Sequence, residues 1–254
     1  MALPTLPAPV AALVRELAEV PGVVAVALGG SRAAGAERPD SDWDLGLYHR
    51  GGVDPEALWA LGHPGYVSAP GEWGPIMDGG AWLTVGGLAV DALYRDLERI
   101  ERWWEEAEAG RFEIVAQTGY LAGAPTYLPV GELALGLPFA GDLPRPGFPE
   151  ALAEAAARRW EGAASAALMF AGLQARGGDA VGCAGMLAQA VLCAGHARVA
   201  GRREWVLNEK RLVARAGLEA AEPVLAAVGS TSDELCASVE AVGAVLGLKP
   251  LVVR

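Results

Sequence analysis

The pattern of apolar residues changes near Pro149, and this change restricts the fold more than any other feature of the chain. Before it, short apolar runs with strand-like spacing alternate with helical segments and with Gly- and Pro-rich turns. After it, Ala- and Leu-rich stretches with helical periodicity cover residues 149–175, 182–200, 208–216 and 233–246. This predicts an α+β fold, with a small mixed sheet flanked by helices in residues 1–136 and an α-helical bundle in residues 150–254. We expect the Pro- and Gly-dense segment 137–149 to link the two domains.

The first half contains six well-marked elements. Residues 9–20 have apolar positions at helical spacing, 23–28 form a short Val-rich run, and 43–48 alternate with a period of two. Two further runs, 82–85 and 88–94, flank Gly86-Gly87 and predict a β-hairpin, after which Asp96 caps an acidic helix over 97–109. A short helix is expected after Asp54-Pro55, and residues 62–80 are expected to be mostly loop.

Three parts of this half carry residues suited to phosphate and metal chemistry. The run 23–28 ends in Gly29-Gly30-Ser31, where the backbone can approach a phosphate chain closely. Asp42 and Asp44 stand at positions i and i+2 of the next strand, so their carboxylates project from one face. Asp91 lies on the second strand of the predicted hairpin. Hard carboxylate oxygens suit Mg²⁺, so these acids predict a metal site, with two ions able to stabilise attacking and leaving oxygens at phosphorus.

The order and spacing of these residues resemble the nucleotidyltransferase superfamily typified by DNA polymerase beta. Its signature is Gly-[Gly/Ser]-Ser, a loop of about ten residues, Asp-x-Asp and a later Asp, and all of these stand here in order over residues 23–94. The resemblance extends more weakly to the whole chain, because the small-molecule branch, such as the kanamycin and lincosamide nucleotidyltransferases, also carries a helical C-terminal domain.

This resemblance implies roles for the matching residues. Ser31 and its neighbouring backbone would hold the β- and γ-phosphates of ATP or another nucleoside triphosphate. Asp42 and Asp44 would ligate both Mg²⁺ ions and Asp91 the catalytic one. Asp91 could also help to deprotonate the acceptor hydroxyl, so that a nucleoside monophosphate, most simply AMP, is transferred to a small molecule and pyrophosphate is released.

Several other residues are candidates on weaker grounds. Arg32 follows the Gly-Gly-Ser turn and is either a phosphate contact or half of a surface ion pair. Lys210 is one of only two lysines in the chain, and it stands in what reads as the first turn of a helix capped by Asn208, where a cation is unfavourable unless a ligand such as triphosphate selects it. The alternative is an ordinary solvated helix start. Glu113 and Glu132 are candidate general bases by position alone.

The charge of the chain narrows its partners. Thirty-one acidic and 20 basic residues give a net charge of −11 and a sequence pI of about 4.8. Such a surface would repel nucleic acid and anionic membranes, and it favours a cationic or neutral small-molecule acceptor. Aminoglycosides are polycations of this kind, so a role in antibiotic resistance is one expectation, although the charge could equally serve solubility.

The remaining features concern compartment and alternative functions. Three cysteines without CxxC spacing, no recognisable signal peptide and no run of 18 apolar residues predict a cytoplasmic protein without a membrane span. The alternatives are a minimal nucleotidyltransferase that AMPylates protein side chains, a transferase that acts on a nucleotide, and a non-catalytic nucleotide-binding or antitoxin-like module. The oligomeric state is left open.

Overall fold

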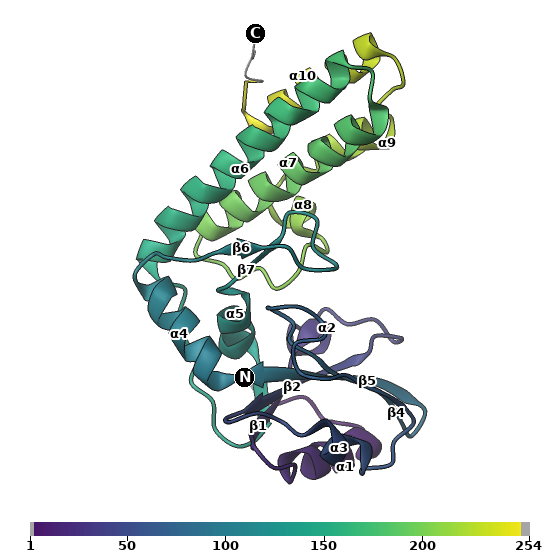
Figure 1. The fold of residues 1–254 in the computed structure, drawn as a ribbon, viewed down its shortest axis with the longest axis vertical. Coiled ribbons are helices and arrows are strands. Elements are labelled where there is room, and N and C mark those ends of the chain that lie inside the picture. The colour runs from purple at the N-terminus through teal and green to yellow at the C-terminus, as the bar shows by residue number, and fades with distance from the viewer. Residues whose placement is uncertain (1–2, 250–254) are drawn as a thin grey trace. The chain divides into compact units, whose positions relative to one another are not determined.

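The chain forms two compact units in the computed structural model, which describes residues 3–249 (Figure 1). Unit 1 takes in the described residues up to Glu106 together with Glu113–Thr118 and Ala124–Gly147. Unit 2 takes in Ala107–Phe112, Gly119–Gly123 and the described residues from Phe148 onward. The chain therefore passes between the units several times, rather than once through a single linker.

Unit 1 is built on a six-stranded mixed sheet in the order β3-β4-β5-β2-β1-β8, as expected for an α+β fold. Only β2 and β5 run parallel; the other neighbouring strands are antiparallel. The strands are β1 (Val23–Leu28), β2 (Trp43–His49), β3 (Gly65–Val67), β4 (Gly80–Val85), β5 (Leu88–Asp96) and β8 (Leu137–Ala140). A small two-stranded sheet pairs β6 (Ile114–Val115) with β7 (Ala124–Pro125).

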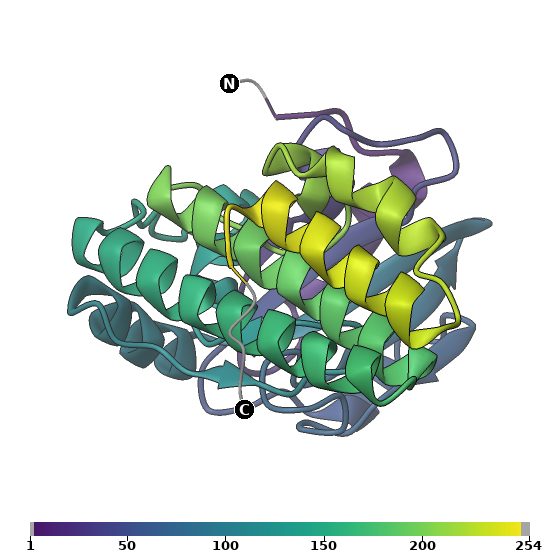
Figure 2. The ribbon, with the colours of Figure 1, turned by 90° about the horizontal axis from the view of Figure 1, so that it is seen from above.

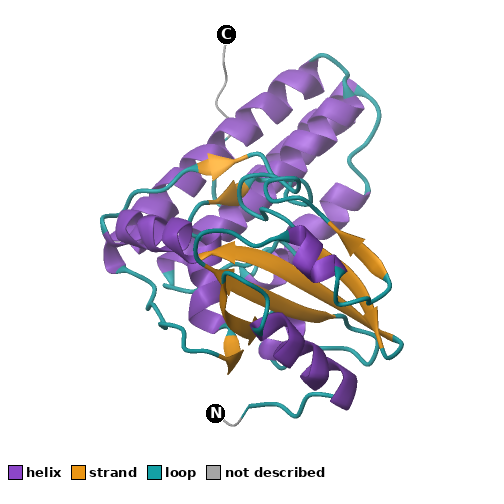
Figure 3. Ribbon diagram, turned by 60° about the horizontal axis from the view of Figure 1, so that its bottom comes forward, coloured by secondary structure: helices purple, strands orange, loops and turns teal. Residues whose placement is uncertain are grey.

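The core of unit 1 lies on one face of the large sheet. Helix α1 (Ala8–Ala18) packs its apolar side against β1 and lies beside the sheet (Figure 3). Alternate residues of β2 and β5, such as Leu45 and Val90, belong to the same buried core. Each fully buried leucine there contributes about 1.5–3 kcal/mol. Because side chains alternate along a strand, Asp44 and Asp91 are on the opposite face.

The predicted hairpin is confirmed, and its turn fixes the register of β4 against β5. Gly86 and Gly87 have φ of +58° and +81°, the positive values that a type I′ turn needs at both central positions. Val85 pairs with Leu88 across this turn. The same register places Trp82 opposite Asp91.

The acidic helix predicted after the hairpin is also present, as α4 (Leu97–Glu108). The Asp96 carboxylate accepts hydrogen bonds from the N–H groups of Glu98 (3.0 Å) and Arg99 (3.3 Å), which caps the helix. Gly110, with φ of +69°, follows its end. The short helices of unit 1 are α2 (Gly30–Ala33), α3 (Pro55–Trp59) and α5 (Leu128–Leu135).

The segment 137–149, expected to be a linker, begins with a strand. β8 pairs with β1 at the edge of the large sheet, where Pro138 can be accommodated because one side of an edge strand needs no ladder hydrogen bond. Strand β3 lies within the expected loop 62–80. In both places glycine and proline obscured a strand that long-range pairing stabilises.

Unit 2 contains three long helices that lie side by side: α6 (Glu150–Arg176), α7 (Ala180–Gly201) and α10 (Ser232–Leu246) (Figure 2). Buried alanines recur on α6 at helical spacing, which lets neighbouring helices approach closely. A capping box formed by Thr231 and Glu234 begins α10. Three short elements complete the unit: α8 (Leu212–Arg215), a 3₁₀ turn (Glu219–Ala221) and α9 (Glu222–Ala226).

Helix α7 is long and apolar enough to cross a membrane, as judged by length and composition alone. Its most apolar window is 44% buried inside the structure, and it packs along α6. The central helix of a soluble bundle passes the same test, so this helix is weak evidence for a membrane span.

A histidine is enclosed in the core of unit 2. His196 on α7 is only 1% exposed, and its ring stacks on Trp160 with centroids 4.3 Å apart. Neither ring nitrogen has a hydrogen-bond partner among the described residues; the Glu209 carboxylate is 3.9 Å from Nε2. Burial lowers the pKa of His196 to about 4, and the charge of Arg215 acts in the same direction.

This histidine should make the protein less stable in acid. The unfolded chain takes up a proton near pH 6.5 and the folded one only near pH 4, so stability present above pH 6.5 is lost as the pH falls towards 4. At 1.36 kcal/mol per pKa unit the loss approaches about 3 kcal/mol. Urea unfolding at pH 7 and pH 4.5 should show that His196→Phe, which can still stack on Trp160, reduces the pH dependence by this amount. A His196→Phe variant with the same pH dependence as wild type would contradict the prediction.

Candidate active site

Two of the three predicted metal ligands lie side by side on the open face of the unit 1 sheet. Asp44 and Asp91 are direct partners in the register of the parallel strands β2 and β5. Neighbouring strands lie about 4.8 Å apart, and residues in register point to the same face. Both side chains are partly exposed to solvent. The sheet thus brings together two carboxylates that are 47 residues apart in the sequence.

The Gly-Gly-Ser turn lies directly against Asp44. The Gly29 N–H donates to the Asp44 carbonyl oxygen over 2.8 Å, extending the pairing of β1 with β2 by one residue. Gly30 has φ of +60°, and a Cβ atom there would lie 1.8 Å from the Oδ2 atom of Asp44. Glycine is therefore required at position 30 both by the backbone conformation and by the carboxylate. Ser31, partly buried, follows in the first turn of α2.

Asp42 is placed differently. It is exposed and immediately precedes β2, and among residues 3–249 no group of three or more His, Cys, Asp or Glu side chains is arranged to hold a metal ion. The expected three-carboxylate cluster is therefore not assembled. The pair Asp44 and Asp91 still fits Mg²⁺, which is commonly held by one or two carboxylates completed by phosphate oxygens and water.

Arg32 stabilises the loop that leads to Asp42. Its guanidinium donates to the carbonyl oxygens of Ser41 and Asp42, the latter over 3.1 Å, and it stacks on the Trp43 ring with 4.1 Å to the centroid. It thereby joins the start of α2 to the start of β2. These contacts position the segment that carries Asp42, and the phosphate contact expected of Arg32 stays a prediction.

Lys210 belongs to unit 2. The helix predicted over residues 208–216 begins later than expected. The Asn208 side chain accepts from the Lys210 N–H over 3.0 Å, closing a turn, and Arg211 adopts a left-handed conformation with φ of +59°. Helix α8 begins only at Leu212, so Lys210 is not in a helical first turn. Asn208 reads as a helix cap in the sequence because the same side-chain hydrogen bond closes isolated turns.

Sequence reasoning missed the role of the neighbouring Glu209. Its two carboxylate oxygens accept hydrogen bonds from the N–H groups of Leu121 (2.7 Å) and Ala122 (2.8 Å), all within unit 2. Glu209 thus ties a loop 87 residues away in the sequence to the segment that carries Lys210. No local pattern could have indicated a pairing of this length.

Neither proposed general base has a position that supports that role. Glu132 on α5 forms a two-pronged ion pair with Arg95, whose side chain is 3% exposed; the distance from Nη2 to Oε1 is 2.9 Å. A carboxylate that neutralises a buried guanidinium is committed to structure. Glu113 is exposed, and its backbone N–H donates to the Thr126 hydroxyl.

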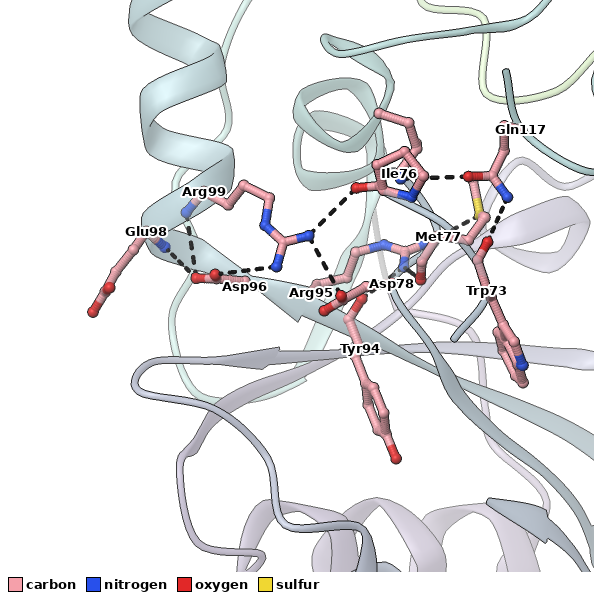
Figure 4. A network of polar contacts seen from close by, with 11 residues as sticks. Trp73, Ile76, Met77, Asp78, Tyr94, Arg95, Asp96, Glu98, Arg99 and Gln117 are labelled. Carbon is pink, nitrogen blue, oxygen red and sulfur yellow. Dashed lines mark hydrogen bonds and ion pairs between the residues drawn. The ribbon is translucent and has the colours of Figure 1, made fainter. Parts of the chain in front are cut away.

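A polar network fixes the loop that precedes β4 (Figure 4). Arg95 donates to the Met77 carbonyl oxygen (3.3 Å), and Arg99 donates to the Pro75 carbonyl oxygen (3.3 Å) and the Asp78 carboxylate (3.4 Å). Gln117 donates to the Trp73 carbonyl oxygen over 2.6 Å. The loop is thus held at several points, which the sequence, rich in glycine and proline here, did not indicate.

Two exposed aromatic residues lie on the strands next to the two aspartates, on the same face of the sheet. Trp82 on β4 is the register partner of Asp91, and Tyr66 on β3 is the register partner of Trp82. The Trp82 ring stacks on Trp73, with centroids 4.6 Å apart and planes at 19°. Tyr66, Trp82, Asp91 and Asp44 therefore project from the same face of four successive strands.

A scan against protein-family models and a search of the curated proteins each find no match to this chain. The function is therefore argued from the geometry of the site.

Proposed function

We propose that the chain is a Mg²⁺-dependent nucleotidyltransferase that transfers a nucleoside monophosphate, most simply AMP from ATP, to a hydroxyl of a small molecule. The acceptor oxygen forms a bond to the α-phosphorus, the bond between the α-phosphorus and the bridging oxygen breaks, and pyrophosphate leaves. The hydroxyl proton passes to a carboxylate.

One observation carries this proposal: the paired carboxylates of Asp44 and Asp91 lie next to a Gly-Gly-Ser turn whose Gly30 packs against one of them. Asp44 and Asp91 are register partners on adjacent strands, so their carboxylates can share one cation. A Gly-Gly-Ser turn beside them can accept a phosphate chain, because its glycines let the chain approach closely and its backbone N–H groups and hydroxyl can donate hydrogen bonds.

Each residue of the site has a proposed role in this reaction. The backbone N–H groups of Gly30 and Ser31 and the Ser31 hydroxyl hold the β- and γ-phosphates. Gly29, whose N–H donates to the Asp44 carbonyl oxygen, places the turn beside Asp44, and Arg32 fixes the adjoining loop. Asp44 and Asp91 would hold Mg²⁺, which when bound neutralises charge on the phosphates. Asp91 accepts the hydroxyl proton. A second ion would need Asp42 as an additional ligand. The phosphate contact expected of Lys210 stays a prediction.

The acidic composition of the chain supports a cationic or neutral acceptor over a nucleic acid. The same charge distinguishes less clearly between a small molecule and a protein side chain. AMPylation of a protein is therefore the second transfer reaction to test. The intact pair of carboxylates counts against a purely non-catalytic module.

The test is Mg²⁺-dependent release of pyrophosphate from ATP in the presence of aminated and neutral polyhydroxy compounds. Asp91→Asn is expected to reduce the rate by about a hundredfold or more, because charge stabilisation of this kind contributes on that scale. The same variant should weaken Mn²⁺ binding, measured by electron paramagnetic resonance without any turnover.

Asp40→Asn is the matched control. Asp40 is exposed, pairs with Arg38 on the surface and lies two residues from Asp42, so the same chemical change there should alter neither rate nor Mn²⁺ binding. Absence of pyrophosphate release with every acceptor, or an Asp91→Asn variant as active as wild type, would contradict the proposal.

A further inference from the structure

A short loop of unit 2, residues 119–123, is bounded in the sequence by residues of unit 1. It connects β6 to β7, and the residues directly before and after it belong to unit 1. Within unit 2 the Tyr120 hydroxyl donates to the Leu207 carbonyl oxygen over 2.7 Å. The Glu209 carboxylate holds two backbone N–H groups of the same loop. These hydrogen bonds attach a segment that enters unit 2 for only five residues.

The Glu209 carboxylate also lies next to the enclosed ring of His196. Its Oε2 atom accepts from the Leu121 N–H over 2.7 Å, and its Oε1 atom accepts from the Ala122 N–H over 2.8 Å. The same Oε1 atom is 3.9 Å from His196 Nε2, about 1 Å too far for a hydrogen bond. Neither ring nitrogen has a hydrogen-bond partner among residues 3–249. One carboxylate oxygen therefore holds the loop while an unpartnered imidazole stands beside it.

Both side chains are shielded from solvent, so a change of charge at the ring must be answered by the protein. The His196 side chain is 1% exposed and the Glu209 side chain 10%. A protonated imidazole carries an N–H donor on each nitrogen and a positive charge, which is strongly unfavourable when it is buried without a counter-ion. Glu209 can supply both the acceptor and the counter-ion if its Oε1 atom moves towards the ring.

The other groups around the ring offer no competing anion. Helix α6 contributes the Trp160 ring, and α8 contributes the cation Arg215. One turn earlier on α7, burial and the neighbouring Glu209 raise the pKa of Cys193 to about 12, so its thiol is neutral. Among residues 3–249, Glu209 is the one carboxylate within 4 Å of a His196 ring nitrogen. Burial and the charge of Arg215 lower the pKa of His196 to about 4, so the ring is neutral at pH 7.

We propose that Glu209 and His196 form a pH-sensitive switch that controls the attachment of the loop 119–123. While His196 is neutral, Glu209 holds the Leu121 and Ala122 N–H groups and the loop stays attached to unit 2. When His196 takes up a proton from solvent, the Glu209 carboxylate turns to the imidazolium. The hydrogen bond from Ala122 is lost first, because it shares Oε1 with the ring, and the loop is released.

Amide hydrogen exchange of the full chain, followed by NMR between pH 7 and pH 4, tests the switch. After correction for the intrinsic pH dependence of exchange, the protection of the Ala122 amide is expected to fall at least tenfold. The fall should follow the titration of the His196 ring, measured in the same samples, and the Leu121 amide should lose less protection. The amide of Leu187, inside α7, should stay within twofold. An equal loss at Leu187 would mean that unit 2 unfolds as a whole, and it would overturn the proposal.

His196→Phe removes the proton acceptor but keeps a ring that can stack on Trp160. In this variant the protection of Ala122 should be the same at pH 7 and pH 4 within twofold. His49→Phe is the matched control, because His49 is 5% exposed, lies in unit 1 and has an Nδ1 atom without a partner in the described part of the chain. This control should lose Ala122 protection as wild type does.

Two results would contradict the switch. If His196→Phe loses Ala122 protection in acid as wild type does, the proton acts on Glu209 itself and the histidine has no part in releasing the loop. If the wild-type Ala122 amide loses its protection at a pH where the His196 ring is still neutral, the two events are not linked. The second result needs no variant, so it decides the question even if His196→Phe does not fold.

Discussion

Gly30→Ala is expected to lower Mg²⁺-dependent pyrophosphate release by about a hundredfold, although it adds a single methyl group. The added Cβ would lie 1.8 Å from Asp44 Oδ2 and 2.5 Å from its Cγ, so the carboxylate must move by more than 1 Å. Displacement of a catalytic group by about 1 Å can reduce a rate by roughly this factor. The measurement is the initial rate of pyrophosphate release, together with Mn²⁺ affinity, which should fall in parallel.

Gly35→Ala is the control that separates the steric clash with Asp44 from the backbone strain of a positive φ. Gly35 has φ of +63°, nearly the value at Gly30, but a Cβ there meets no atom within 4 Å. Both variants should therefore lose about 1 kcal/mol of stability from the left-handed conformation, and only Gly30→Ala should lose activity. Equal activity of the two variants would show that the position of the Asp44 carboxylate does not matter for turnover.

Glu132→Ala is expected to destabilise unit 1 by about 3–5 kcal/mol, the largest stability effect that the structure indicates. Arg95 is 3% exposed. Its Nε and Nη2 groups both donate to the Glu132 carboxylate, and both would lose this acceptor. Removing one partner of a buried ion pair lowers the free energy of unfolding by more than the intact pair contributes, because a desolvated charge is left without its counter-ion. Thermal and urea unfolding monitored by circular dichroism would measure the loss.

The double substitution Arg95→Met with Glu132→Leu is the control for this pair. It removes both charges and fills the space with apolar atoms, so it should recover most of the stability lost in Glu132→Ala. If the double variant were as unstable as the single one, the hydrogen bonds from Arg95 to the Met77 and Tyr94 carbonyl oxygens would carry the stability instead.

The sequence predicted the local elements of unit 1 well because their signals are local. Strand β1 was expected at the residues where it occurs, the Gly86-Gly87 turn has the conformation that its glycines require, and Asp96 caps α4 as expected. The spacing of Asp42, Asp44 and Asp91 also indicated a common site. For Asp44 and Asp91 the structure brings the residues together, while Asp42 stays outside the pair.

The remainder depended on contacts between distant parts of the chain. The cluster formed by the rings of Tyr66, Trp73 and Trp82 could not be predicted, because Tyr66 and Trp73 lie in a segment whose glycines and prolines indicate a loop. Only the pairing of β3 with β4 places Tyr66 beside Trp82. The observed partners of Arg32 and Glu132 could not be predicted for a similar reason. The contact of Arg32 with the Ser41 carbonyl oxygen and the ion pair of Glu132 with Arg95 depend on tertiary packing.

The two-residue turn at Gly86-Gly87 also limits how the length of this chain can vary. Register on β5 decides that Asp91 faces the site while Val90 and Ala92 face the core. One residue inserted between the turn and Asp91 would send the carboxylate into the core and an apolar side chain into the site, whereas two residues would restore the alternation. Natural length changes in this hairpin should therefore occur in even steps, because the turn sets which face of the sheet each β5 side chain occupies.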